Sequence, residues 1–302
     1  MNDMMKPYID LIAKILETGD VKNDRTKTGT LSLFGEQIKF DVREFAPFLT
    51  QRKLTIKNTI GEMLWFMEGS TNARRLKELY NCNFWDEWSS PIDGDIGPMY
   101  GYQWRKRLND QLVYLIDTLA KDPDSRRLLV CSWDSDTLPI PGYAPCEQPA
   151  MGLGALPPCH FAYQLNTAKD RNSDNEWWVD LQLYQRSCDL LVGGPINIAM
   201  YYVLQVILCK IANVHPDANG RTYKPRTLTI TYGDVHVYNN HIEKAKILIG
   251  LPAYPPATFN PQLDFTNFLS RIESDGPQLQ KELFAAVTGY KSGPVLKFER
   301  NI

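Results

Sequence analysis

Cys159 has the sequence setting in this chain that best fits covalent chemistry. It follows Pro157 and Pro158 and precedes an alternating run that is typical of a β-strand. Because proline fixes its own φ and pushes the preceding residue toward extended geometry, we expect Cys159 at a rigid loop-to-strand junction. A thiol attacks as the thiolate, which nearby cations favour. Cys159 is therefore a candidate nucleophile, and a buried small apolar side chain is the alternative.

Arginines in several segments could supply positive charge and bind an anion. Arg186 lies in an otherwise apolar strand pattern, beside a hydroxyl and close to a carboxylate. Guanidinium forks match phosphate oxygens bidentately. Scattered surface charge is the alternative for each arginine taken alone. A phosphomonoester dianion would suit the combined set, which is Arg25, Arg126, Arg127, Arg186 and Ser187.

Three other positions offer polar chemistry. Glu62 falls within an apolar helical stripe, where burial would raise its pKa and suit it to proton relay, although a satisfied structural acid is the alternative. Asn197 follows a glycine pair that begins at Gly193; it could cap the next helix or read a pyrimidine edge. His236 and Tyr238, two residues apart, would point the same way from an extended segment. They could bracket a sugar hydroxyl or pack at a helix start.

The composition is that of an ordinary globular protein. The chain has 302 residues, a formal net charge of −2 and 43% hydrophobic residues. This charge gives no reason to expect nucleic acid as a partner. We expect no signal peptide and no membrane span, since no run of about 18 apolar residues occurs. Six cysteines without a CxxC pair or zinc spacing indicate reduced thiols in a cytoplasmic protein that binds no metal.

Hydrophobic periodicity predicts one α+β domain over residues 1–302. Helices are expected at 8–16, 55–67, 71–80, 110–120, 197–212 and 234–248, and strands at 30–40, 127–133, 160–165, 177–185, 227–232 and 295–298. Residues 83–105 are rich in aromatics and glycine without a clear period, which is typical of a pocket lining or a packed loop. The proline- and glycine-rich residues 139–155 are expected to form a surface-loop insertion ahead of Cys159.

Nine short segments of the chain together make the sequence similar to thymidylate synthases. They occur in the order of that family and extend over the chain from about Tyr8 to Phe298. Each is weak alone, but their agreement makes the resemblance specific. The segments are Arg25–Thr30, Gly61–Phe66, Trp85–Trp88, Asp95–Gly101, Asp124–Arg127, Pro157–His160, Gln185–Asp189, Asn197–Ala199 and His236–Tyr238.

The resemblance implies a fold and an assembly. The fold would be a large mixed β-sheet flanked by helices, with the sheets of two copies packed back to back in an obligate homodimer. Arg126 and Arg127 would then reach the active site of the neighbouring subunit. Residues 294–302 would form a closing tail that ends at Ile302, and the protein would act in the cytoplasm, or in the host cytoplasm if viral.

The resemblance also implies a reaction and a role for each site residue. Cys159 would attack C6 of dUMP, so that C5 takes a methylene group from the co-substrate 5,10-methylenetetrahydrofolate, without a metal. Glu62 would anchor a water network, and Tyr100 would assist proton removal from C5. The remaining contacts would be Arg25, Arg126, Arg127, Arg186 and Ser187 on the phosphate, Gln185, Asp189, Asn197, His236 and Tyr238 on the rest of the nucleotide, and Trp85, Trp88, Asp189, Gly193 and Ile302 on the folate side.

Two outcomes of this chemistry stay open. Hydride transfer would give dTMP and dihydrofolate, whereas water would give 5-hydroxymethyl-dUMP and tetrahydrofolate, as in related phage hydroxymethylases. Asn197 favours uracil, because relatives that act on dCMP carry an aspartate there. The segment Trp85–Trp88 favours methylation. The polar Arg300 and Asn301 predict a looser tail that would admit water, which favours hydroxymethylation. A non-catalytic RNA-binding member is a third alternative, against which the intact cysteine and arginine argue.

Overall fold

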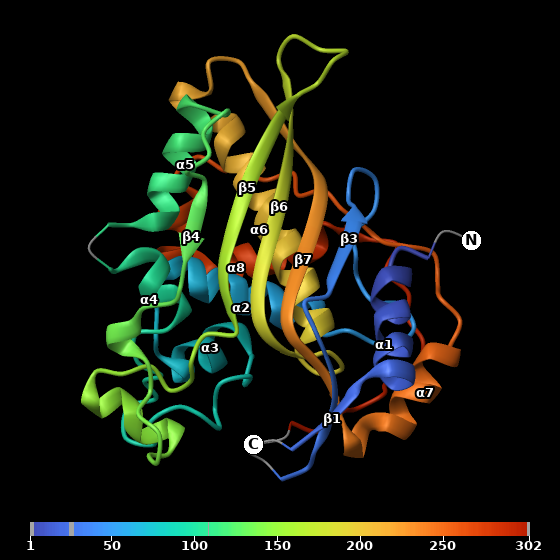
Figure 1. The fold of residues 1–302 in the computed structure, drawn as a ribbon. Coiled ribbons are helices and arrows are strands. Elements are labelled where there is room, and N and C mark those ends of the chain that lie inside the picture. Colours follow the sequence, from blue (N-terminus) through green and yellow to red (C-terminus); the bar gives the residue numbers. More distant parts are fainter. Residues whose placement is uncertain (1–2, 24–26, 108, 301–302) are drawn as a thin grey trace.

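A seven-stranded mixed sheet forms the centre of the computed structural model, which describes residues 3–23, 27–107 and 109–300 (Figure 1). The strand order is β1-β2-β7-β6-β5-β4, with β3 also paired to β7. Strands β6 and β7 are parallel, and the other pairs are antiparallel. The strands are β1 (Asp20–Lys22), β2 (Thr30–Phe34), β3 (Gln37–Asp41), β4 (Leu129–Cys131), β5 (His160–Lys169), β6 (Glu176–Asp189) and β7 (Thr222–Tyr238).

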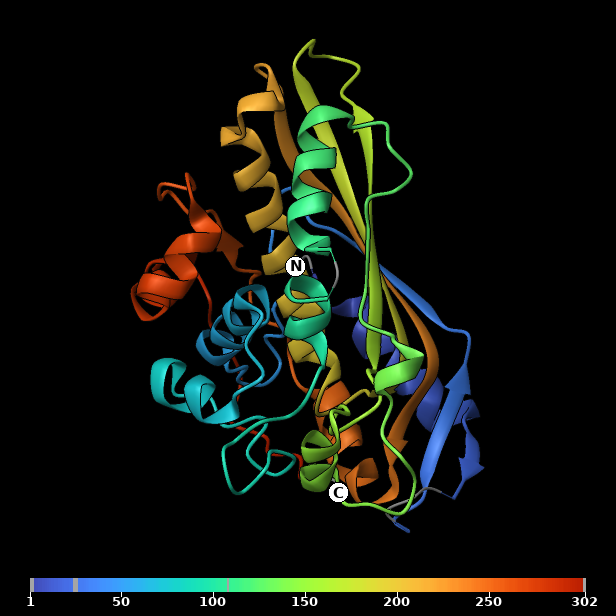
Figure 2. The same cartoon turned by 90° about the vertical axis from the view of Figure 1, so that its left-hand side faces the viewer.

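Helices cover one face of this sheet (Figure 2). The predicted α+β fold with a large mixed sheet flanked by helices is therefore confirmed. The helices are α1 (Lys6–Thr18), α2 (Ile56–Glu68), α3 (Ala73–Tyr80), α4 (Tyr100–Arg105), α5 (Gln111–Lys121), α6 (Gly194–Val214), α7 (Ile242–Gly250) and α8 (Phe268–Ala285). Shorter elements are the 3-10 helices η1 (Ser135–Thr137), η2 (Pro145–Met151), η3 (Pro216–Ala218) and η4 (Asn239–His241), and the strand pair β8 (Thr258–Phe259) and β9 (Val287–Thr288).

Helix α6 lies between the sheet and α2 and is buried along most of its length. It is long and apolar enough to cross a membrane, but 83% of its most apolar window is buried inside the molecule, as expected of a core helix. The fully buried Gln205 donates hydrogen bonds to the carbonyls of Val179 and Thr227 at 2.8 and 3.0 Å. These bonds tie α6 to β6 and β7, so the end of β6 and the start of α6 keep a fixed relation.

The opposite face of the sheet carries no helix in the part of the chain that the structure describes (Figure 2). Along β6, Leu181 and Leu183 are buried, whereas Asp180 and Gln182 between them are only half-buried. This alternation follows the two-residue period of a strand. A groove of about 430 Å³ crosses the open face and has a mainly polar lining, with Lys39, Gln164, Asn166, Asp180, Gln182 and Thr229 among its residues.

The structure corrects two predicted elements. The helix predicted over 234–248 is confirmed only from Ile242 onward, because β7 continues to Tyr238 and α7 begins at Ile242. Strand partners on both sides of β7 outweigh the turn signal of Gly233 and Asp234. The strand predicted at 295–298 is wrong, since this segment has no ladder partner among the described residues and lies as an extended tail.

The prolines and glycines of residues 139–155 form a compact loop that packs on itself. The Gln148 side chain accepts a hydrogen bond from the Ile140 amide and donates one to its carbonyl, at 3.0 and 2.8 Å. Gly97, with φ of +71°, approaches the loop so closely that a Cβ there would overlap the Leu153 carbonyl oxygen. The loop therefore buttresses the segment that leads into α4.

Replacing Gly97 with alanine should destabilise the protein by about 2 kcal/mol or more beyond the effect of Gly142→Ala. Both glycines have a positive φ, so both substitutions strain the backbone, but nothing lies within 4 Å of a Cβ at Gly142. Urea unfolding of the two variants measures the difference. Equal losses would show that the loop does not press on Gly97.

Candidate active site

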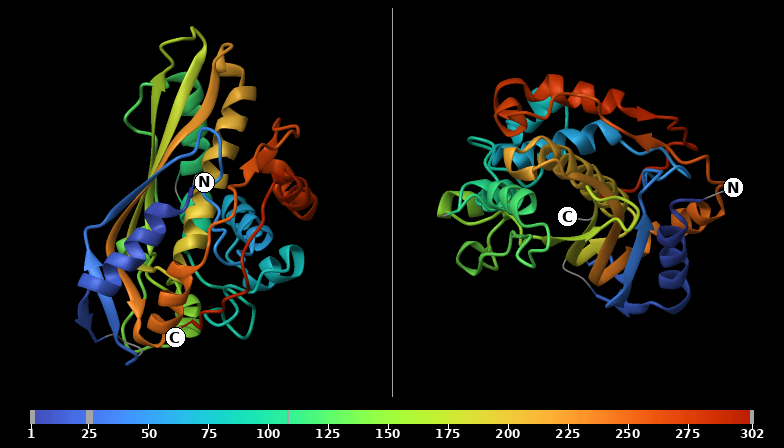
Figure 3. Two further views of the ribbon diagram at one scale, coloured as in Figure 1. Left: turned by 90° about the vertical axis from the view of Figure 1, so that its right-hand side faces the viewer. Right: turned by 90° about the horizontal axis from the view of Figure 1, so that it is seen from above.

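Most of the predicted site residues lie at the end of the sheet where three adjacent strands meet. His160, the first residue of β5, pairs with Gln185 near the end of β6. Asp189, the last residue of β6, pairs with His236 near the end of β7. The start of β5 and the ends of β6 and β7 thus converge, and the C-terminal tail runs down to this end of the molecule (Figure 3).

Cys159 lies at the predicted loop-to-strand junction, where Arg186 holds the loop. The Arg186 guanidinium donates from Nε to the Pro158 carbonyl at 2.9 Å and from Nη2 to the Pro157 carbonyl at 2.7 Å. Its backbone N–H also donates to the Cys159 carbonyl at 2.8 Å. Arg186 Nη2 lies 3.8 Å from Cys159 Sγ. One arginine therefore fixes both the position and the electrostatic surroundings of the thiol.

The charge state of Cys159 differs from the sequence expectation of a stabilised thiolate. Burial raises the pKa of the thiol above its ordinary value, and the nearby Arg186 charge lowers it only in part. The thiol is therefore protonated at neutral pH, and some of the Cys159 surface is still accessible. The thiol proton has to leave as the sulfur forms a bond.

Tyr100 and His160 form a stacked pair beside Cys159. The Tyr100 hydroxyl accepts a hydrogen bond from the Cys159 amide at 2.9 Å, and its ring stacks on His160 at 3.9 Å. His160 Nδ1 lies 2.8 Å from the Tyr201 hydroxyl. Burial lowers the pKa of His160 to about 3, so the ring is neutral. Sequence reasoning missed His160 and Tyr201, since neither sits in a pattern that signals this stacking.

Glu62 is buried on α2, as the sequence predicted. Trp85 donates a hydrogen bond from Nε1 to Glu62 Oε1 at 2.7 Å. Burial raises the pKa of Glu62 to about 7, while the Trp85 hydrogen bond and the Arg300 charge lower it. Trp88 packs edge-on against Trp85 at 5.6 Å. A carboxyl that titrates near neutral pH beside an aromatic wall suits proton transfer.

The turn between β6 and α6 is held by Asp189. Its Oδ1 accepts hydrogen bonds from the backbone N–H groups of Leu191 and Val192 at 3.0 and 3.1 Å. Burial outweighs these two bonds and raises the pKa of Asp189. The helix begins at Gly194. Asn197 therefore lies in the first turn, and the sequence alternative of Asn197 as the cap is wrong.

Gly193 and Asn197 leave polar groups available at this turn. A Cβ at Gly193 would meet nothing closer than 3.7 Å, so the described residues leave open space beside this glycine. The half-buried Asn197 amide forms no hydrogen bond within the described part of the chain. Its donor and acceptor can therefore serve a ligand.

His236 and Tyr238 point the same way from β7, as predicted. Their rings meet edge-on at 5.2 Å. His236 Nδ1 is 2.8 Å from Asp234 Oδ1, and this contact holds the pKa of Asp234 well below its ordinary value. Asp234 also accepts hydrogen bonds from Lys22 and Ser32. The imidazole orientation is thus set by a carboxylate that is itself anchored.

Other predicted residues differ in how the structure places them. Gln185 and Ser187 lie on β6 beside Arg186, and Gln185 Oε1 is buried without a partner among the described residues. Arg126 and Arg127 are exposed in the turn between α5 and β4, away from the strand ends. Arg25 and Ile302 lie outside the described residues.

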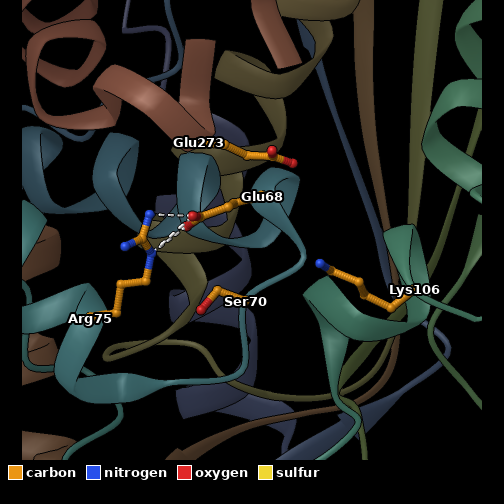
Figure 4. Close-up of a pocket in the computed structure, with 5 residues that line it drawn as sticks. All are labelled: Glu68, Ser70, Arg75, Lys106 and Glu273. Atoms are coloured by element: carbon orange, nitrogen blue, oxygen red, sulfur yellow. Dashed lines mark hydrogen bonds and ion pairs between the residues drawn. The ribbon is translucent and has the colours of Figure 1, made fainter. Parts of the chain in front are cut away.

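A second cavity, of about 380 Å³, lies between α2, α3, α4 and α8 (Figure 4). Glu68 and Arg75 form an ion pair on one wall, and the Lys106 side chain points in from the opposite one. Ser70 and Glu273 complete the lining. None of the predicted site residues lines this cavity, so it is separate from the site around Cys159.

A held thiol, a buried carboxyl that titrates near neutral pH and unpaired polar groups at one end of a mixed sheet are typical of an enzyme with nucleophilic and acid–base chemistry. A family model described as thymidylate synthase matches residues 6–301. The chain belongs to the thymidylate synthase family, which confirms the resemblance seen in the sequence. The family transfers one-carbon units to dUMP, with methylenetetrahydrofolate as co-substrate.

Replacing Glu62 with glutamine should stabilise the fold at high pH and impair turnover. The folded-state pKa of about 7 exceeds the ordinary 4.5, so ionisation destabilises the folded protein as pH rises through this window. Relative to wild type, Glu62→Gln should therefore gain up to about 3 kcal/mol between pH 5 and pH 8. Turnover should fall by roughly 10²- to 10⁴-fold.

Urea unfolding at both pH values measures this gain, and exposed Glu44→Gln is the matched control. A stability difference for Glu62→Gln that is the same at pH 5 and pH 8 would contradict a raised pKa.

Proposed function

We propose that this protein methylates dUMP, giving dTMP and dihydrofolate. Cys159 forms a bond from its sulfur to C6 and loses its proton, so that C5 becomes the nucleophile that takes up the methylene group. C5 then loses its own proton, the bond between the methylene carbon and the folate nitrogen breaks with its electron pair going to that nitrogen, and hydride from the tetrahydrofolate so released adds to the methylene carbon. The electron pair released into the ring expels the Cys159 thiolate, while tetrahydrofolate is oxidised to dihydrofolate.

The polar groups around Cys159 suit a nucleotide monophosphate. Arg186 Nη1 forms no hydrogen bond within the described part of the chain, so two N–H groups are available for a phosphate even though Nε and Nη2 hold the loop. The unpartnered Asn197 amide and Gln185 Oε1 suit the uracil edge. Tyr100, next to the Cys159 amide, suits proton removal from C5.

The observation that supports hydride transfer is the set of contacts that hold the C-terminal tail against the rest of the protein. Arg52 lies over the Phe298 ring at 5.0 Å, and Lys244 Nζ donates to the Lys297 carbonyl at 3.0 Å. The Phe298 ring also meets His241 edge-on at 5.3 Å. A tail held over the strand ends excludes water from a reactive methylene group, which favours hydride.

Addition of water to the methylene carbon, giving 5-hydroxymethyl-dUMP and tetrahydrofolate, is the second candidate function. The observation in its favour is Arg300, whose charged side chain is 28% exposed beside Trp88. A charged and partly exposed side chain at this point of the tail can hold water close to the expected folate side.

Two copies of the chain would complete the site. Leu165 on β5 donates a hydrogen bond to the Leu128 carbonyl, directly after Arg126 and Arg127. Six residues of strand separate Leu165 from Cys159, roughly 20 Å at the rise of a strand. This separation supports a role of the two arginines in the site of a neighbouring copy, and the helix-free face of the sheet is the surface that a partner's sheet would cover.

Product analysis with dUMP and methylenetetrahydrofolate tests the proposed reaction. We expect dTMP and dihydrofolate to form in equal amounts. Chromatography measures dTMP, and absorbance measures dihydrofolate. Formation of 5-hydroxymethyl-dUMP with tetrahydrofolate and no dihydrofolate would overturn methylation in favour of hydroxymethylation.

Asn197→Asp should shift the substrate preference from dUMP toward dCMP by roughly tenfold or more, because a carboxylate accepts from the exocyclic amine of cytosine. The ratio of kcat/KM values for the two nucleotides measures the shift. Asn213, whose amide donates to the Tyr223 carbonyl at the far end of α6, provides the control Asn213→Asp. An unchanged ratio for Asn197→Asp would show that the base is read elsewhere.

A further inference from the structure

Arg300, near the end of the tail, makes three contacts with the segment that follows α3. Its Nη1 donates to the Phe84 carbonyl at 2.9 Å and to a Glu87 carboxylate oxygen at 3.0 Å. Its guanidinium also lies over the Trp88 ring at 5.6 Å. A carbonyl, a carboxylate and an aromatic face together satisfy a guanidinium in a single orientation.

These contacts differ in kind from those along the rest of the tail. Upstream, the tail is held at Leu296, Lys297 and Phe298 through carbonyls and one aromatic ring, by groups of Arg52 and Lys244. At Arg300 the tail itself supplies the side chain, which reaches the Phe84 carbonyl and the Glu87 carboxylate. The sequence predicted a looser tail at this position, whereas the contacts of Arg300 indicate a tail that is held in place.

The position of Arg300 also connects the tail to the buried carboxyl. Trp88 packs on Trp85, and Trp85 donates its hydrogen bond to Glu62. The Arg300 charge is one of the two influences that lower the pKa of Glu62 against the effect of burial. The tail, the aromatic wall and the carboxyl thus form one contiguous set of contacts.

We propose that Arg300 is a positioning residue that latches the tail against Glu87 and Trp88, and that this latch decides whether hydride or water completes the reaction. The inference rests on the proposed function. With the latch closed, hydride reaches the methylene carbon and the folate is oxidised. With it open, a water oxygen adds to that carbon and loses a proton, and the folate leaves unoxidised; in both cases the electron pair expels the Cys159 thiolate.

Hydrogen–deuterium exchange of the ligand-free protein tests the latch directly. In Glu87→Gln, and likewise in Arg300→Gln, the backbone amides of residues 295–300 should exchange faster than in wild type, because the tail loses a contact that holds it. The increase should be roughly 3- to 10-fold, since partly exposed ion pairs and cation–π contacts contribute modest free energies. The double variant should exchange no faster than either single one, since both act through one contact. Asp86→Asn is the matched control, because Asp86 pairs with Lys77 instead.

Product partition tests the consequence. Glu87→Gln and Arg300→Gln should raise the share of 5-hydroxymethyl-dUMP severalfold over wild type, whereas Asp86→Asn should not. Unchanged exchange in the two latch variants would overturn the latch. Faster exchange with an unchanged partition would overturn its control over the product. If wild type already forms only 5-hydroxymethyl-dUMP, methylation and control of partition both fail, while the exchange comparison still decides whether the latch exists.

Discussion

The arrangement of the site depends on the bonds that Arg186 makes to the loop before β5. Two prolines restrict the backbone conformation of the loop. The Arg186 guanidinium donates hydrogen bonds to the carbonyls of both prolines, which fixes the loop relative to β6. The same side chain brings positive charge to 3.8 Å from the sulfur. Loss of Arg186 would therefore move the nucleophile and change its electrostatics at once, and the two effects cannot be separated at this residue.

Burial leaves the main acid–base groups in their neutral forms. The thiol of Cys159 is protonated because burial raises its pKa, and the imidazole of His160 is neutral because burial lowers its pKa. Glu62, with a pKa of about 7, is the group of this set that titrates near neutral pH. This supports a role for Glu62 in relaying protons during the reaction.

Local patterns in the sequence predicted much of this arrangement. The junction at Cys159 follows from two prolines before an alternating run, and the burial of Glu62 follows from the helical stripe around it. The end of β7 could not be predicted locally, because its extended form depends on β2 and β6, which are distant in the sequence. The stacking of His160 on Tyr100 is likewise a long-range contact.

The contacts of the C-terminal tail are also long-range and could not be predicted from local sequence patterns. Its polar residues suggested a loose closure, since sequence alone does not reveal that Arg300 meets Glu87 and Trp88. Composition therefore predicted the polarity of the tail but not its partners. The closing segment is defined by contacts across more than 200 residues of chain.

Mass spectrometry of a trapped complex tests the covalent role of Cys159 most directly. A dUMP analogue with fluorine at C5 cannot lose a proton from that carbon, so the adduct with methylenetetrahydrofolate should accumulate. We expect a mass increase equal to the nucleotide plus the folate, located on the peptide that contains Cys159. A protein that turns over dUMP but gains no such mass, or gains it on a peptide without Cys159, would contradict it.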